Sequence, residues 1–163
     1  MKALQLLLKT SDLSAPLIAR VILGVVMFPH GAQKMLGWFG GHGFSGTMGF
    51  FTGTMHIPAV FAFATIMAEF AGSLALIAGL FSRVAAFGIA SVMCVAILTA
   101  HEANGFFMNW SGSQAGEGFE YHLLAIGLSL VVLVSGGGKA SLDSVIQRKL
   151  TANGARPSAD KPL

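Results

Sequence analysis

Charge is the scarcest property of this sequence. Only 10% of its 163 residues are charged, against about a quarter in an average soluble domain, and 54% are hydrophobic. This composition excludes an ordinary soluble domain. It predicts a single membrane domain, residues 1–150, followed by a polar, disordered tail, residues 151–163. The net charge of +3 does not indicate a nucleic-acid partner, because the basic residues are scattered instead of clustered on one polar face.

Cysteine is almost absent as well. The single cysteine, Cys94, lies within an apolar run, which excludes a disulfide framework or a CxxC redox pair within one chain. Histidines and carboxylates also lack the HExxH or ExxH spacing of a metal box. No phosphate-cradling loop opens a helix, and nothing indicates a haem or a flavin. No motif therefore predicts a metal site or a covalent cofactor.

Long apolar runs are what the sequence has. Four of them, at residues 13–36, 58–80, 83–100 and 119–137, each have the length and composition of a membrane-spanning helix. Small residues on these spans favour packing into an all-α, antiparallel four-helix bundle in the lipid bilayer. After Ser141, apolar residues at helical spacing beside basic ones predict a short amphipathic helix on the membrane surface, residues 142–150.

The connection at residues 37–57 differs from a flexible linker. It contains seven glycines, five aromatic residues and no carboxylate. Aromatic side chains favour the depth of the lipid headgroups, and glycine allows close approach of the backbone. We expect an extracytoplasmic cap or re-entrant loop here.

The basic residues predict the orientation. With four spans both ends of the chain lie on the same side, and that side receives eight lysines and arginines, whereas the other side receives only Lys34. By the positive-inside rule, both termini are expected in the cytoplasm of a multi-pass protein of the inner membrane. His30, His101 and His122 then lie near the outer ends of the helices.

Glu69 is the ionisable residue that the second apolar run carries near its middle. A charge at that depth costs at least about 2.5 kcal/mol on insertion scales, so the carboxylate needs a partner, a proton or internal water. Arg20 enters the first run from the cytoplasmic side, and its long side chain could reach a neighbouring helix. We therefore predict a buried Arg20–Glu69 pair, with either a purely structural role or a catalytic role in proton transfer.

A second group of polar residues gathers at the outer ends of the helices. Its members are imidazoles, carboxylates and one amine: His30, Lys34, His101, Glu102, Glu117, Glu120 and His122. Such groups could bind a quinone ring by hydrogen bonds, ligate a metal, or simply be solvated at the headgroups. The sequence alone leaves all three open.

Several separated segments resemble one family. They are RVILGVVMFPHGAQKMLGWFGGHGFSGTMGFF, AEFAGSLALIAGLFSRVAA, HEANGFFMNWSGSQAGEGFEYHLL and SGGGKASLD. Together they are similar to the DoxX family of small bacterial four-helix membrane proteins, over roughly residues 13–145. The polar and glycine positions of these motifs that the resemblance marks as candidates are Arg20, His30, Gly31, Lys34, Glu69, Glu117, Glu120 and Tyr121.

The resemblance implies a function in membrane redox chemistry. The relatives that gave the family its name belong to a thiosulfate:quinone oxidoreductase, and others are partners of redox-defence enzymes. We therefore expect a membrane subunit of an oxidoreductase system that binds a quinone or similar apolar redox ligand near the outer ends of the helices. A protein partner is expected, and self-association into a homo-oligomer is left open. The alternatives are a scaffold that recruits a soluble redox enzyme and a small-molecule permease.

Overall fold

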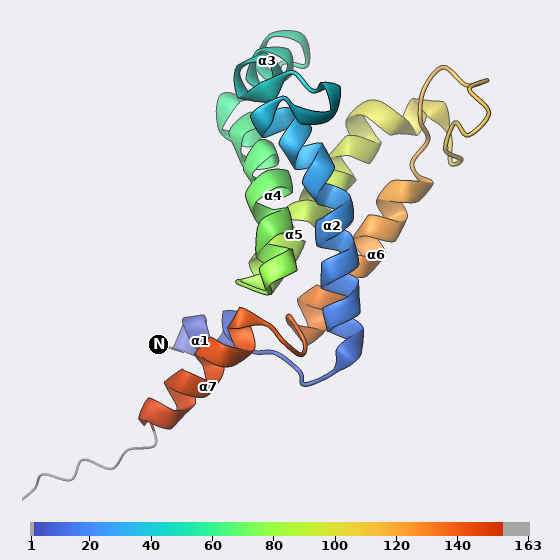
Figure 1. The fold of residues 1–163 in the computed structure, drawn as a ribbon. Helices are drawn as coiled ribbons and strands as arrows, with labels where there is room; N and C mark the ends of the chain where they lie inside the picture. Colours follow the sequence, from blue (N-terminus) through green and yellow to red (C-terminus); the bar gives the residue numbers. More distant parts are fainter. Residues whose placement is uncertain (1, 155–163) are drawn as a thin grey trace, which may run out of the picture.

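The computed structural model describes residues 2–154, all in helices, turns and loops, without a β-strand in that range. Three helices are long and apolar enough to cross a membrane: α2 (Ser14–Leu36), α4 (Ala59–Ala78), and α5 (Ser82–Ala96) with its continuation to Asn104. A fourth, α6 (Glu120–Ser135), is equally apolar but has only 16 residues, about 24 Å of helix. The prediction of an all-helical membrane bundle is confirmed (Figure 1).

The four helices form a ring in the order α2, α4, α5, α6, and α2 packs most extensively on α4. Small residues set the distance between these two helices. A Cβ atom added to Gly31 would lie 2.5 Å from the backbone of Phe70, and one added to Gly24 would lie 2.8 Å from the carbonyl oxygen of Ser73. Gly31 is therefore level with the Glu69–Phe70 turn of α4, and Arg20 lies further down, level with the end of α4.

Both ends of the bundle carry additional helices. At the end that we call the terminal end, α1 (Lys2–Leu8) contacts α7 (Leu142–Gly154) (Figure 1). The Ser141 hydroxyl accepts a hydrogen bond from the Ser144 N–H at 3.2 Å and so caps α7. Because α7 extends to Gly154, it includes the first four residues of the expected disordered tail, and residues 155–163 lie outside the described part.

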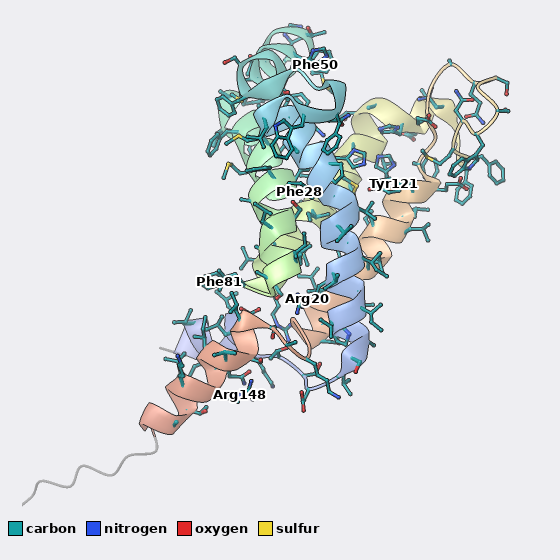
Figure 2. All side chains as sticks on the ribbon, in the orientation of Figure 1. Arg20, Phe28, Phe50, Phe81, Tyr121 and Arg148 are labelled. Carbon is teal, nitrogen blue, oxygen red and sulfur yellow. The ribbon has the colours of Figure 1, made fainter. Side chains whose placement is uncertain are left out.

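At the opposite end, the cap end, residues 37–57 are folded, as predicted for a cap. They form η1 (Trp38–Gly40), α3 (Gly43–Gly49) and the π-helical turn η2 (Phe50–Thr54). Aromatic rings attach the cap edge-on to the bundle: Trp38 packs on Phe28 of α2, and Phe44 packs on Phe63 of α4, with ring centroids 6.5 and 6.2 Å apart. Phe50 lies in this cap, far from the terminal end (Figure 2).

The predicted Arg20–Glu69 pair is wrong. Arg20 is 1% exposed, and its guanidinium donates hydrogen bonds of 2.6–3.4 Å to backbone carbonyls only. These carbonyls belong to Leu76, Ile77, Gly137, Lys139 and Ala140. The physical reason is that the last carbonyls of α4 have no partner within their own helix. Ile77 also lies eight residues from Glu69, or about 12 Å along the helix.

The other connections at the terminal end follow the same principle. Arg83 donates to the carbonyls of Leu133 and Val134 in the last turn of α6. The buried Asp143 carboxylate accepts the N–H groups of Phe81 and Ser82, at 2.7 and 2.9 Å, and so caps the start of α5. Charged side chains thus tie the helix ends together here.

Candidate functional site

A cavity of about 780 Å³ lies in the cap-end half of the bundle. Side chains from α2, α4, α5 and α6, from the cap and from the loop before α6 form its wall. Most of them are apolar, including Phe50, Phe51, Ile57, Phe61, Val92 and Val95. Its size falls within the range of small-molecule pockets, about 300–1,000 Å³. The structure therefore has a well-formed cavity at the cap end, where the predicted polar residues gather.

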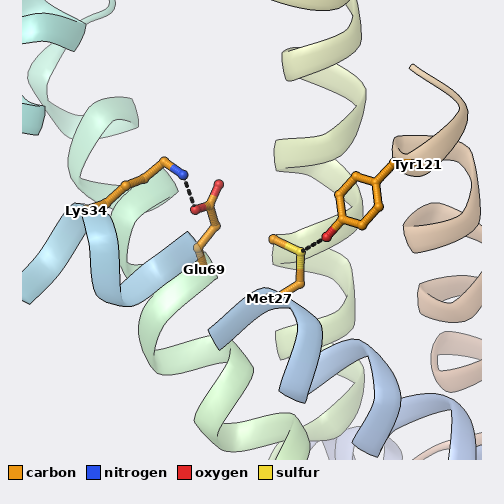
Figure 3. A network of polar contacts seen from close by, with 4 residues as sticks. All are labelled: Met27, Lys34, Glu69 and Tyr121. Atoms are coloured by element: carbon orange, nitrogen blue, oxygen red, sulfur yellow. Dashed lines mark hydrogen bonds and ion pairs between the residues drawn. The ribbon is translucent and has the colours of Figure 1, made fainter. Parts of the chain in front are cut away.

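The charged partner of Glu69 is Lys34. The two side chains form an ion pair with Nζ and Oε2 2.5 Å apart, and they line the cavity (Figure 3). Glu69 is only 4% exposed, so the pair supplies the counter-charge that a carboxylate at this depth requires. Lys34 is one helical turn beyond Gly31, where α2 approaches α4 most closely, and this places its amine over Glu69.

A second polar group comes from α2 and α6. The Tyr121 hydroxyl donates a hydrogen bond to Sδ of Met27 at 3.3 Å, across the two helices (Figure 3). The His30 ring lies beside that of Tyr121, with 5.9 Å between the ring centroids. All three residues line the cavity. A thioether is a weak acceptor, so the Tyr121 hydroxyl can turn to a better acceptor inside the cavity at little cost.

Two histidines complete this wall. The rings of His101 and His122 lie 4.2 Å apart between centroids. Nδ1 of His101 is 2.8 Å from the carbonyl oxygen of Glu117. Because a carbonyl only accepts, Nδ1 carries the proton of the neutral ring, and Nε2 retains its lone pair. His122 is 6% exposed, and its Nδ1 has no hydrogen-bond partner among the described residues.

Glu117 and Glu120 mainly organise the loop before α6. Glu120 Oε1 accepts hydrogen bonds from the Met108 N–H and from Nε1 of Trp110, at 3.0 and 3.2 Å. Glu117 Oε2 accepts the Asn109 N–H at 2.7 Å. Glu117 still borders the cavity, whereas Glu120 is not part of its wall.

Most of the predicted site residues therefore come together, although three do not. Six line the cavity in addition to Glu117: His30, Lys34, Glu69, His101, Tyr121 and His122. Arg20 lies at the terminal end (Figure 2), Glu102 is outside the cavity wall, and Glu120, the first residue of α6, bonds to the loop. Sequence reasoning missed Met27 and the apolar wall. Met27 shares a helical face with Gly31 and Lys34, and that pattern could have identified it.

A metal site finds no support in this arrangement. Within residues 2–154, no three His, Cys, Asp or Glu side chains are placed to hold one ion together. The carboxylate of Glu69 forms an ion pair with Lys34, and the carboxylates of Glu117 and Glu120 accept hydrogen bonds from N–H groups of the loop. What the wall offers is a row of hydrogen-bonding groups facing apolar surfaces.

Comparison with known proteins supports the resemblance seen in the sequence. The profile of the DoxX family matches residues 15–102, which is more than half of the chain and includes α2, the cap, α4 and α5. No curated protein and no solved structure matches the chain significantly. With an all-helical apolar bundle and a family profile over most of it, this chain is a membrane protein that belongs to the DoxX family.

Proposed function

We propose that the protein is a membrane subunit of an oxidoreductase system and that its cavity binds a quinone or a similar apolar redox ligand. The observation that carries this proposal is the two-sided wall of the cavity. Polar groups come from α2, from η3 (Ile97–His101) and from α6, and they belong to His30, Lys34, His101 and Tyr121. Phenylalanine and aliphatic side chains line the rest. A flat apolar ring with oxygen atoms at its edge fits such a chamber.

The polar groups can serve quinone oxygens directly. The Lys34 ammonium and the Tyr121 hydroxyl are donors to a quinone oxygen, and the His30 imidazole can donate or accept. Nε2 of His101, whose ring donates through Nδ1 to the Glu117 carbonyl, can accept from a hydroxyl of the reduced quinone. When bound, a quinone supplies the capacity to take up two electrons and two protons. The chain would hold the ring and exclude water from its apolar side. We assign Glu69 the role of keeping the Lys34 amine protonated through their ion pair. We assign Arg20 a positioning role at the helix ends.

The redox partner and the cellular location belong to the same proposal. The resemblance to relatives in membrane redox assemblies supports a partner protein. The distribution of basic residues supports an inner-membrane location, with both termini and the terminal end in the cytoplasm and the cavity toward the outer surface.

Equilibrium binding of a tritiated tailless quinone, menadione, to the purified protein tests the proposal. Removing one hydrogen bond costs about 0.5–1.5 kcal/mol, so Tyr121→Phe and His30→Ala should each weaken binding by roughly three- to tenfold. His42→Ala removes a cap histidine that is not part of the cavity wall and should leave binding unchanged. Absence of saturable binding to the wild-type protein would refute the proposed function.

A further inference from the structure

The cavity opens sideways between α4 and α5. These helices pack closely at the middle of α4, where a Cβ atom added to Gly88 would lie 3.2 Å from that of Ala68. Toward the cap end they separate. α5 continues through the π-helical turn η3 (Ile97–His101) and runs away from α4 toward the loop before α6 (Figure 1).

The edges of this opening are apolar and exposed. Along α5 and η3, Phe87, Ser91, Val95 and Thr99 recur every four residues, line the cavity and are exposed. This strip spans 12 residues, or about 18 Å. The hydroxyls of Ser91 and Thr99 donate to the carbonyls one turn earlier, at 2.8 Å in both cases, and need no further partner. Phe61 and Ala64 of α4 form the opposite edge.

The surroundings of the opening are those of a lipid-facing surface. Val60 and Phe63 on α4, and Val84 and Leu98 on α5 and η3, are between 48% and 70% exposed. In a bilayer, these side chains contact acyl chains. His30, Lys34, Tyr121 and His122 lie on the far wall, on α2 and α6, where the Tyr121–Met27 hydrogen bond joins the two helices. Glu69 of α4 is paired with Lys34 of that wall, and His101 ends η3. Polarity therefore falls from the far wall to the opening.

We infer that the ligand is a membrane-dissolved quinone with a long isoprenoid tail, that it enters from the lipid between α4 and α5, and that its tail lies along the Phe87–Thr99 strip. This inference rests on the proposed function and adds the substrate class and the route to it. A ring turned toward Lys34 and Tyr121 leaves its tail no exit through the polar wall. The tail then leaves through the gap, where it meets only apolar atoms and satisfied hydroxyls.

Blocking the gap without touching the polar wall tests the inference. Ser91→Trp places an indole in the opening, and Val84→Trp is the matched control, because Val84 is two turns earlier on the same side of α5 and outside the cavity wall. Both variants and the wild type are reconstituted in lipid nanodiscs, and binding of tritiated menadione and of tritiated long-tailed menaquinone is measured. Overpacking of this kind should weaken binding of the long-tailed quinone to Ser91→Trp by about tenfold. Binding of menadione to Ser91→Trp should weaken far less than binding of the long-tailed quinone, and both affinities of Val84→Trp should not change.

The other outcomes separate the two proposals. If wild-type protein binds both quinones and Ser91→Trp weakens both equally, or neither, the route is wrong and the quinone site stands. If the wild-type protein binds menadione alone, the inference of a long-tailed ligand is wrong. If the wild-type protein binds neither quinone, the proposed function fails and this inference fails with it. A change in the oligomeric mass of Ser91→Trp, measured by light scattering, would show that the gap is instead an interface between copies and would overturn the inference.

Discussion

Replacing Arg20 by methionine should destabilise the bundle more than any exposed substitution. Four of the five carbonyl contacts of its guanidinium are 2.9 Å or shorter, and they join the end of α4 to the segment between α6 and α7. Hydrogen bonds within membrane proteins average about 0.6 kcal/mol and reach about 1.7, so losing four amounts to roughly 2–7 kcal/mol. For a chain of this size, we expect the melting temperature to fall by roughly 10 °C.

The assay is the loss of the monodisperse size-exclusion peak after heating in detergent. Arg20→Lys should give an intermediate value, because three donors on one nitrogen cannot reach both groups of carbonyls. Arg148→Met is the matched control, since Arg148 is exposed and bonds only to Ser144 of its own helix. If Arg20→Met melts at the same temperature as Arg148→Met, the guanidinium does not hold the helix ends together and our account of it is wrong.

Three further sets of substitutions test the helix packing, the helix cap and the ion pair. Gly31→Ala forces a Cβ atom against the backbone of α4 and should lower the free energy of unfolding by about 1–3 kcal/mol. Its control, Gly127→Ala, meets nothing within 4 Å and should be neutral or slightly stabilising. Equal melting temperatures of the two variants would contradict the register of α2 on α4. Asp143→Ala should cost about 1–2 kcal/mol through the uncapped start of α5, and Asp143→Asn should cost less; no change would exclude the cap. Glu69→Gln and Lys34→Met should couple by about 1 kcal/mol in a double-mutant cycle of unfolding, and additive effects would contradict their ion pair.

Much of the fold was predictable because lipid imposes simple rules. A segment in the bilayer must satisfy its own backbone, so apolar runs such as residues 58–80 indicate helices almost regardless of context, and the structure has α4 at residues 59–78. The glycine- and aromatic-rich composition of residues 37–57 likewise predicted a folded cap. The π-helical turns at η2 and η3 were not predictable, because nothing in a period of 3.6 residues marks an inserted residue.

The pairing of charges was harder to predict. Arg20 was matched with Glu69 because an acid in a membrane needs a cation, but Arg20 and Lys34 lie on the same face of α2, and only the register against α4 decides between them. That register depends on the close approach at Gly31. The carbonyls that hold Arg20 are invisible in a pattern of side chains. One of these carbonyls belongs to Gly137, at the end of the fourth apolar run, and accepts from Arg20 at 2.7 Å.

Identification of the lipophilic molecules that copurify with the protein tests the central claim most directly. The protein is extracted gently into nanodiscs without detergent, and its bound lipophilic molecules are quantified by mass spectrometry against the surrounding lipid. We predict a long-tailed quinone enriched to about one molecule per chain, as expected of a single well-formed chamber. A quinone content no higher than that of the bulk lipid, together with no saturable binding of added quinone, would contradict the account.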